Sequence, residues 1–199
     1  GVWGWTLAGL ALFPAIFLLS LAGSSLLGLE PRHTFYLHES GLTLISLIIV
    51  KFLYQLIFFN ATGEEAGWRG FALPRLQART NPLITALIIG FFWASWHFFL
   101  WQAEGRPVFD WQFWAEMYVA HMLGSLIIVW VCNRAGGSIL VAGVTHAAAN
   151  TVQAFIPMPD WRVLLSACLV TVLVMILADK MWKKLPSDHP AVYQTDSGM

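Results

Sequence analysis

Charge is scarce in this sequence. Lys, Arg, Asp and Glu together make up 11% of its 199 residues, whereas soluble domains carry about 25%. The formal net charge is zero, so no basic surface that would attract nucleic acid is expected. Hydrophobic residues reach 58% and fall in long runs. These features exclude an ordinary soluble domain and predict a polytopic membrane protein.

Cysteine is also rare, and the first 29 residues carry no charged side chain. Cys132 and Cys168 both sit in or beside apolar runs, so we interpret them as small hydrophobic residues rather than as a disulfide. The first charged residue is Glu30, so the basic region that begins a signal peptide is missing. We therefore expect residues 3–29 to form a helix that stays in the protein.

Six apolar segments are each near the roughly 20 residues that span a bilayer. They predict an all-α transmembrane bundle that forms one membrane domain over residues 1–199, with a polar tail over 183–199 that we expect to fray. The second segment can extend through Glu64, which would put Lys51 about 20 Å away near the opposite interface. The six segments are 3–29, 41–62, 82–101, 112–131, 138–156 and 162–180.

The distribution of Lys and Arg predicts how the chain is oriented in the cytoplasmic or another cellular membrane. The loops after the second and fourth segments, together with the tail, carry six basic residues, and the opposite side carries three. This excess favours a cytoplasmic C-terminus. The first group is Arg75, Arg79, Arg134, Lys180, Lys183 and Lys184, and the second is Arg32, Arg106 and Arg162.

Two carboxylates and an arginine stand between two long apolar runs, in the stretch 64–69. A charge at a bilayer centre costs roughly 2.5–3.5 kcal/mol, so keeping three of them needs a reason. On a helix Glu65 and Arg69 are four residues apart and can pair, whereas Glu64 points about 100° away. We therefore expect Glu65 to have its own counter-ion and Glu64 to be available for chemistry. The simpler alternative is a solvated helix start, with Thr62 as N-cap and Glu65 closing a capping box.

Further polar residues lie in later segments. His97 is placed deep in the third, one turn after the aromatic Trp93. His146 and Asn150 lie in the fifth and share a helix face, with three alanines between them that let a neighbouring helix come close. Intramembrane ionisable residues usually face a cavity or one another. We therefore expect Glu64 to come together with these two histidines and Asn150.

Two chemistries fit this set. Glu64 and His97 can activate a water molecule as general base, while His146 and Asn150 donate hydrogen bonds to a developing oxyanion. Alternatively, His97, His146 and Glu64 can hold a Zn²⁺ ion with one position open for water. The His-Glu-x-x-His pattern of soluble zinc proteases is absent from the sequence. The choice between the zinc and the metal-free mechanism stays open at this point.

Two other polar residues are left out of the expected site. Glu116 and His121 lie in the fourth segment, and a spacing of five puts them about 140° apart on a helix. They therefore do not form a shared polar face, and we expect neither to take part.

The polar residues form three motifs that resemble those of the CAAX protease and bacteriocin-processing family, also called Abi proteins. The motifs are Glu64-Glu65-x-x-x-Arg69, Trp93-x-x-x-His97 and His146-x-x-x-Asn150. Members of this family are intramembrane endopeptidases and include the Ras-converting prenyl proteases. The resemblance implies a helical protease core over about residues 41–156, with its site in a cavity inside the bilayer.

The resemblance also implies roles for individual residues. Glu64 would activate water with His97, His146 and Asn150 would form the oxyanion side, and Glu65 and Arg69 would support them. The family usually has Phe where this sequence has Trp93, which keeps an aromatic wall and can alter the cavity shape. The implied substrate is a peptide bond near the C-terminus of a lipidated or membrane-bound protein. The family is described both as metal-dependent and as glutamate-based, so the resemblance leaves the metal open.

Two functions of other classes compete with a protease. One is a non-enzymatic membrane scaffold or immunity protein that keeps the fold without the chemistry. The other is a proton-coupled transporter that uses Glu64 and the histidines as a relay. Many transporters are built from internal repeats, and this sequence shows no repeat between its halves.

Overall fold

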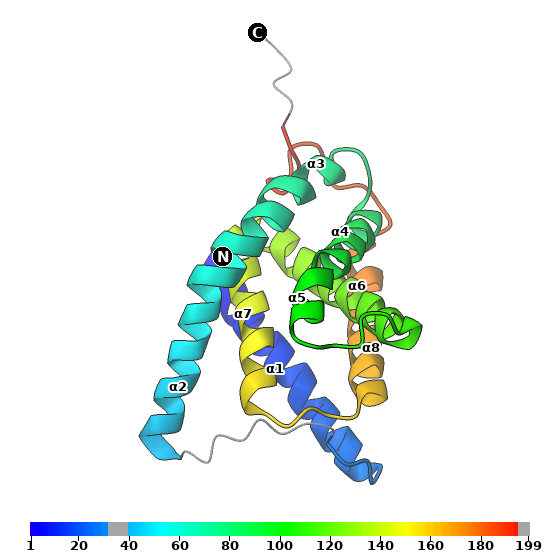
Figure 1. Ribbon diagram of the computed structural model, residues 1–199. Helices are drawn as coiled ribbons and strands as arrows, with labels where there is room; N and C mark the ends of the chain where they lie inside the picture. The colour runs from blue at the N-terminus through cyan, green and yellow to red at the C-terminus, as the bar shows by residue number, and fades with distance from the viewer. Residues whose placement is uncertain (32–39, 195–199) are drawn as a thin grey trace.

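The computed structural model describes residues 1–31 and 40–194, and within these ranges every regular element is a helix (Figure 1). Five helical stretches are long and apolar enough to cross a membrane, and α7, with 17 residues, is a shorter apolar helix. The expected transmembrane bundle is therefore confirmed. The elements are α1 (Val2–Leu26), α2 (Gly41–Tyr54), η1 (Gln55–Ala72), α3 (Leu73–Gln77), α4 (Pro82–Trp96), α5 (Phe98–Ala103), α6 (Trp111–Arg134), α7 (Ile139–Phe155) and α8 (Trp161–Asp179).

The second span extends through Glu64, as in the longer of the two registers considered for it, and ends beyond it. Elements α2, η1 and α3 join into one helical stretch, Gly41–Gln77, of 37 residues. Its middle part, η1, is a π-helix, a wider form with i→i+5 hydrogen bonds that often marks functional sites. Thr62 lies inside η1, where its hydroxyl donates to the carbonyl of Ile57 at 2.5 Å. The capping-box alternative is therefore wrong, because no helix begins at Thr62.

Short polar residues begin the later helices. The side chains of these N-cap residues accept hydrogen bonds from backbone N–H groups that have no partner inside the helix. Pro82 follows the first of them, and its fixed φ suits the first helical position. The caps are Asn81 to Ile84 N (2.9 Å), Asp110 to Gln112 N (2.7 Å), Ser138 to Val141 N (3.4 Å) and Asp160 to Arg162 N (2.9 Å).

Small residues bring the helices of the core into close contact, as is typical of membrane bundles. A Cβ atom placed on Gly90 of α4 would lie 2.7 Å from the Cα of Met122 in α6. A Cβ atom on Gly143 of α7 would lie 3.0 Å from that of Ala61 in η1. Helix α7 also packs against α1, so its middle is buried on both sides. This burial fixes the helix that carries His146.

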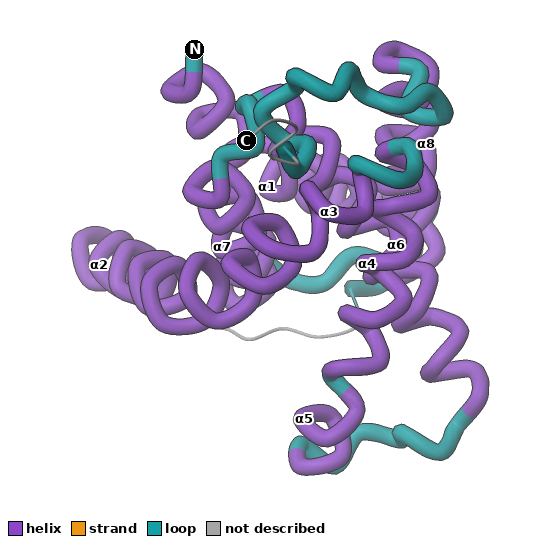
Figure 2. Tube along the Cα trace, turned by 90° about the horizontal axis from the view of Figure 1, so that it is seen from above, coloured by secondary structure: helices purple, strands orange, loops and turns teal. Residues whose placement is uncertain are grey.

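The third expected span is interrupted. The regular helix α4 ends at Trp96, and His97 is the junction from which α5 continues. Figure 2 shows α5 and the following loop standing apart from the other helices. His97 thus lies at a turn inside the helical stretch Pro82–Ala103, a departure from regular helix geometry that the sequence did not predict.

The C-terminal tail packs against one end of the bundle, up to residue 194. Tyr193 N donates to the carbonyl of Pro74 at 3.0 Å, and Gln77 Nε2 donates to that of Ala191 at 2.8 Å. The expectation of a frayed tail is wrong for this part, because Ala191 and Val192 are buried. Residues 195–199 lie outside the described ranges.

This end of the bundle also gathers basic residues of the larger predicted group. The guanidinium of Arg75 lies 4.5 Å from the ring centroid of Tyr193, and Arg134 pairs with Asp179 at the end of α8. Arg32, from the smaller group, lies outside the described ranges. Which side of the membrane this end faces stays a prediction.

Candidate active site

The π-helix η1 carries a fully buried ion pair. Nη1 of Arg69 lies 2.9 Å from Oε1 of Glu65, and neither side chain is exposed. The pairing expected from the spacing of four is therefore present. Arg69 also reaches Ser125 Oγ on α6 at 3.4 Å. Glu65 Oε2 and Arg69 Nε are also buried, and within the described ranges neither atom has a hydrogen-bond partner.

Glu65 also holds His146, which the sequence did not predict. Nδ1 of His146 lies 2.8 Å from Oε1 of Glu65, and the imidazole is buried. A carboxylate paired with arginine accepts hydrogen bonds, so we assign Nδ1 as the donor. Arg69, Glu65 and His146 thus form one chain of charge and hydrogen bonds from η1 to α7. Glu65 supports His146 directly.

Glu64 faces another direction and has different neighbours. Its Oε2 accepts a 2.6 Å hydrogen bond from the indole Nε1 of Trp93 on α4. Its side chain lines an open groove of about 370 Å³ between η1 and α4. Glu64 and Glu65 thus differ in their contacts, although Glu64 is restrained by Trp93 rather than unbound, and the division of roles between them stays a prediction. The groove is lined by Gly63, Glu64, Gly67, Trp68, Phe71, Ala72 and Trp96.

Trp93 contacts several of the other residues of the site. Its buried ring lies 5.0 Å from the Arg69 guanidinium and meets His146 edge-on, with ring centroids 4.9 Å apart. The ring of His97 lies 6.0 Å away. The sequence assigned Trp93 only as an aromatic wall, because its hydrogen bond to Glu64 crosses between helices and leaves no periodic signal.

His97 presents one nitrogen for chemistry. Its Nδ1 lies 2.8 Å from the backbone carbonyl of Trp93, which can only accept, so Nδ1 carries the proton. In the neutral ring Nε2 is then a proton acceptor, as a general base requires. The ring stacks on Trp101 at a centroid distance of 5.0 Å and an angle of 19°. These contacts fix the imidazole at the helix break.

A third histidine joins the site. The ring centroid of His121 on α6 lies 4.9 Å from that of His97, 4.8 Å from Trp93 and 5.3 Å from Trp101. The sequence alone leaves His121 out of the expected site, and the structure brings its ring against those of His97 and Trp93. That expectation compared His121 with Glu116 on the same helix, whereas the relevant neighbours are on α4 and α5.

Asn150 meets a residue that the sequence analysis missed. Its Nδ2 lies 3.5 Å from Oδ1 of Asn60, which is fully buried in η1. His146 and Asn150 do share a face of α7, as expected, and both reach η1. The signal that could have revealed Asn60 is its place as a lone amide in the apolar run before Glu64.

The zinc alternative does not fit this geometry. In the described part of the chain, no three His, Cys, Asp or Glu side chains are grouped closely enough to hold a metal ion. Glu64, the third residue of the zinc set, is instead bonded to the indole of Trp93. We therefore route no step through a metal bound by Glu64, His97 and His146.

Comparisons with known proteins agree with the motifs. Residues 42–152 match the family model of the Type II CAAX prenyl endopeptidases, Rce1-like. This chain belongs to that family. The Rce1-like match spans Asn60, Glu64, Trp93, His97, His121, His146 and Asn150.

A curated relative supports this membership. CAAX prenyl protease 2 from Methanococcus maripaludis is 31% identical over 147 residues. The alignment covers 71% of this chain and 53% of that relative, so this chain spans about half the length of the protein it matches. The Rce1-like family is one of membrane proteases, in line with the apolar helices of this chain.

Proposed function

We propose that this chain is an intramembrane endopeptidase that hydrolyses a peptide bond close to the membrane. The observation that carries the proposal is the separation of two adjacent carboxylates. Glu65 is buried in an ion pair and anchors His146, whereas Glu64 lines an open groove beside His97's helix. One glutamate builds the site and the other is available to a substrate.

Glu64 and His97 are the groups that activate water. Glu64 uses Oε2 for Trp93, and among the described residues no hydrogen bond reaches its Oε1. Oε1 and the Nε2 of His97 can then orient a water molecule and take its proton as the water oxygen attacks the carbonyl carbon. The C–N bond breaks after that proton passes to the leaving nitrogen, and the second water proton stays with the new carboxyl group.

His146 and Asn150 are the groups that stabilise the oxyanion. Because His146 donates through Nδ1 to Glu65, its Nε2 can donate to an oxyanion only when the ring carries a second proton. Asn150 contributes an amide N–H from the next turn of α7. Donors held in place before the reaction are usually the largest single contribution to catalysis.

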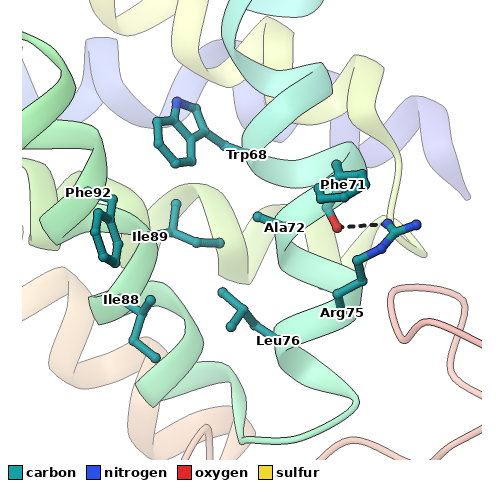
Figure 3. Close-up of a pocket in the computed structure, with 8 residues that line it drawn as sticks. All are labelled: Trp68, Phe71, Ala72, Arg75, Leu76, Ile88, Ile89 and Phe92. Carbon is teal, nitrogen blue, oxygen red and sulfur yellow. Dashed lines mark hydrogen bonds between the residues drawn. The ribbon is translucent and has the colours of Figure 1, made fainter.

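The surface next to Glu64 fits an apolar substrate. A second groove of about 300 Å³ is lined by apolar side chains together with Arg75, and it shares Trp68, Phe71 and Ala72 with the groove at Glu64. Figure 3 shows Leu76 on one side and Ile89 and Phe92 on the other. This continuity favours a membrane-bound or lipidated protein, cut near its C-terminus, as the substrate.

Cleavage of defined peptides tests the proposal. The purified protein in bilayers is incubated with two peptide libraries, one with a prenylated cysteine near the C-terminus and one without, and the products are read by mass spectrometry. We expect cleavage that Glu64→Gln lowers by about 10²-fold or more, because a general base contributes roughly 10²–10⁴-fold. Glu104→Gln, at an exposed glutamate, is the matched control.

Two outcomes of this experiment decide the mechanism. Full turnover by Glu64→Gln would show that Glu64 is not the base. A zinc chelator is added in a parallel reaction, and loss of activity there would contradict the metal-free scheme.

A further inference from the structure

We propose that Asn60 is a positioning residue that sets the orientation of the Asn150 amide. Asn60 is fully buried four residues before Glu64. Its Oδ1 faces Asn150 Nδ2 at 3.5 Å, while its own Nδ2 has no hydrogen-bond partner within the described ranges. An unsatisfied buried donor costs roughly 1–3 kcal/mol, so an amide kept at such a place needs an explanation.

The π-helix explains why Asn60 faces α7 at all. His146 contacts Glu65, and Asn150, one turn later, contacts Asn60. His146 and Asn150 are thus four residues apart on α7, whereas their partners on η1 are five residues apart and run in the opposite direction. On an α-helix, residues five apart point about 140° away from each other. The i→i+5 register of a π-helix brings residues five apart closer to one face than an α-helix does.

The contact decides which end of the Asn150 amide points toward η1. A carbonyl oxygen on Asn60 attracts the NH₂ group of Asn150 and repels its oxygen. Because η1 also carries Glu64, the N–H groups are held on the side where the substrate carbonyl would lie. With the amide turned the other way, an oxygen would face the oxyanion and destabilise it. The separation of 3.5 Å is long, as catalytic hydrogen bonds often are before substrate binds.

Asn60 itself does not touch the substrate, because its amide is enclosed. It acts through Asn150, and the inference therefore rests on the proposed role of Asn150 in the oxyanion site. Loss of such a positioning role should lower kcat without changing KM, because the role operates only when the oxyanion forms. If Asn60 served folding alone, its substitution would lower the amount of folded protein and leave kcat per folded molecule unchanged.

A double-mutant cycle tests the inference. Asn60→Leu removes the acceptor at similar volume, and Asn60→Asp keeps an acceptor oxygen in the same place. We expect Asn60→Leu to lower kcat by about 10-fold to 100-fold with KM within about 2-fold, as outer partners of catalytic groups do. Asn60→Asp should recover part of that loss. In an Asn150→Ala background, Asn60→Leu should change kcat by less than about 2-fold.

Different failures are distinguishable in the same cycle. If Asn150→Ala alone keeps full kcat, the oxyanion role of Asn150 is wrong, and the role of Asn60 with it. If Asn150→Ala lowers kcat but Asn60→Leu multiplies that loss by its full single-mutant factor, only the inference on Asn60 is overturned. Where Asn60→Leu does not fold, as judged by gel filtration, Asn60→Ala takes its place in the cycle with the same expected result.

Discussion

The indole Nε1 of Trp93 donates a 2.6 Å hydrogen bond to Oε2 of Glu64, joining α4 to η1 at the proposed catalytic carboxylate. Phenylalanine, which the motif resemblance leads us to expect at this place, has no such donor. The same ring also contacts Arg69 and His146, which are both partners of Glu65. Trp93 therefore restrains the base as well as forming the wall.

Replacing Trp93 with Phe separates these two roles. The variant keeps an aromatic ring but removes the donor, so Glu64 loses its fixed orientation. We expect kcat to fall about tenfold with little change in KM, since small displacements of a catalytic group can cost up to about 10²-fold. The measurement is steady-state cleavage in bilayers, with the exposed Trp3→Phe as control. Unchanged or faster turnover would show that the hydrogen bond does not help the base.

Breaking the buried ion pair should destabilise the fold strongly. Arg69→Ala leaves Glu65 charged and without its counter-ion inside the bundle, a change that costs about 3–5 kcal/mol. The control is Arg134→Ala, because the Arg134–Asp179 pair is partly exposed and such pairs contribute about 0–1 kcal/mol. Unfolding by a denaturing detergent, followed by circular dichroism, compares the two. Equal losses would mean that burial adds nothing to the pair.

Removing both charges is a separate prediction. Glu65→Gln with Arg69→Met should recover part of the stability lost in Arg69→Ala, because no unpaired charge remains. Catalysis should stay low, by about 10-fold or more, because His146 loses the carboxylate that anchors its Nδ1. Peptide cleavage and unfolding are measured on the same preparation. Full activity in the double variant would show that His146 needs no ionic support.

Substitutions of His121 test whether its ring only packs against the site or takes part in the reaction. Its contacts are ring contacts with His97, Trp93 and Trp101, and its Nδ1 is bonded to the backbone carbonyl of Met117. We expect His121→Phe to keep activity within about 3-fold and His121→Ala to lower it about tenfold, because aromatic pairs contribute roughly 0.5–1.5 kcal/mol. Loss of cleavage in His121→Phe would assign the imidazole a chemical role.

Substitution of Gly90 tests the close packing of α4 against α6. A Cβ atom there would meet backbone atoms of Met122 and His121, which cannot rotate away. We expect Gly90→Ala to destabilise the fold by about 1–3 kcal/mol. Gly4→Ala is the matched control, because a Cβ at Gly4 has no atom within 4 Å. Equal stability of both variants in thermal unfolding would contradict this close approach.

The sequence predicted features that follow from regular α-helical spacing within one helix. The apolar runs located the spans, and the spacing of Glu65 and Arg69 predicted their ion pair. The contacts of Trp93, Asn60 and His121 were not predictable in this way. Each joins two helices, and the register between helices depends on packing that no local pattern records.

Two departures from regular helix geometry were also invisible. The π-helical register of η1 changes which residues share a face, so angles drawn for an α-helix misplace Asn60 relative to Glu65. The break at His97 falls within the stretch 91–101, which is mostly apolar and carries no glycine or proline. Both departures lie at the residues proposed for catalysis.

The helical stretch Gly41–Gln77 is longer than a membrane is thick. At up to about 1.5 Å per residue, its 37 residues extend for as much as about 55 Å, against a hydrocarbon core of about 30 Å. Apart from Lys51, the charged residues of this stretch lie from Glu64 onward, so its excess length can be accommodated by tilting or by extension of this more polar end beyond the hydrocarbon core. We therefore expect the depth of Glu64 to depend on the acyl-chain length of the surrounding lipids, with a thinner bilayer bringing this carboxylate closer to water.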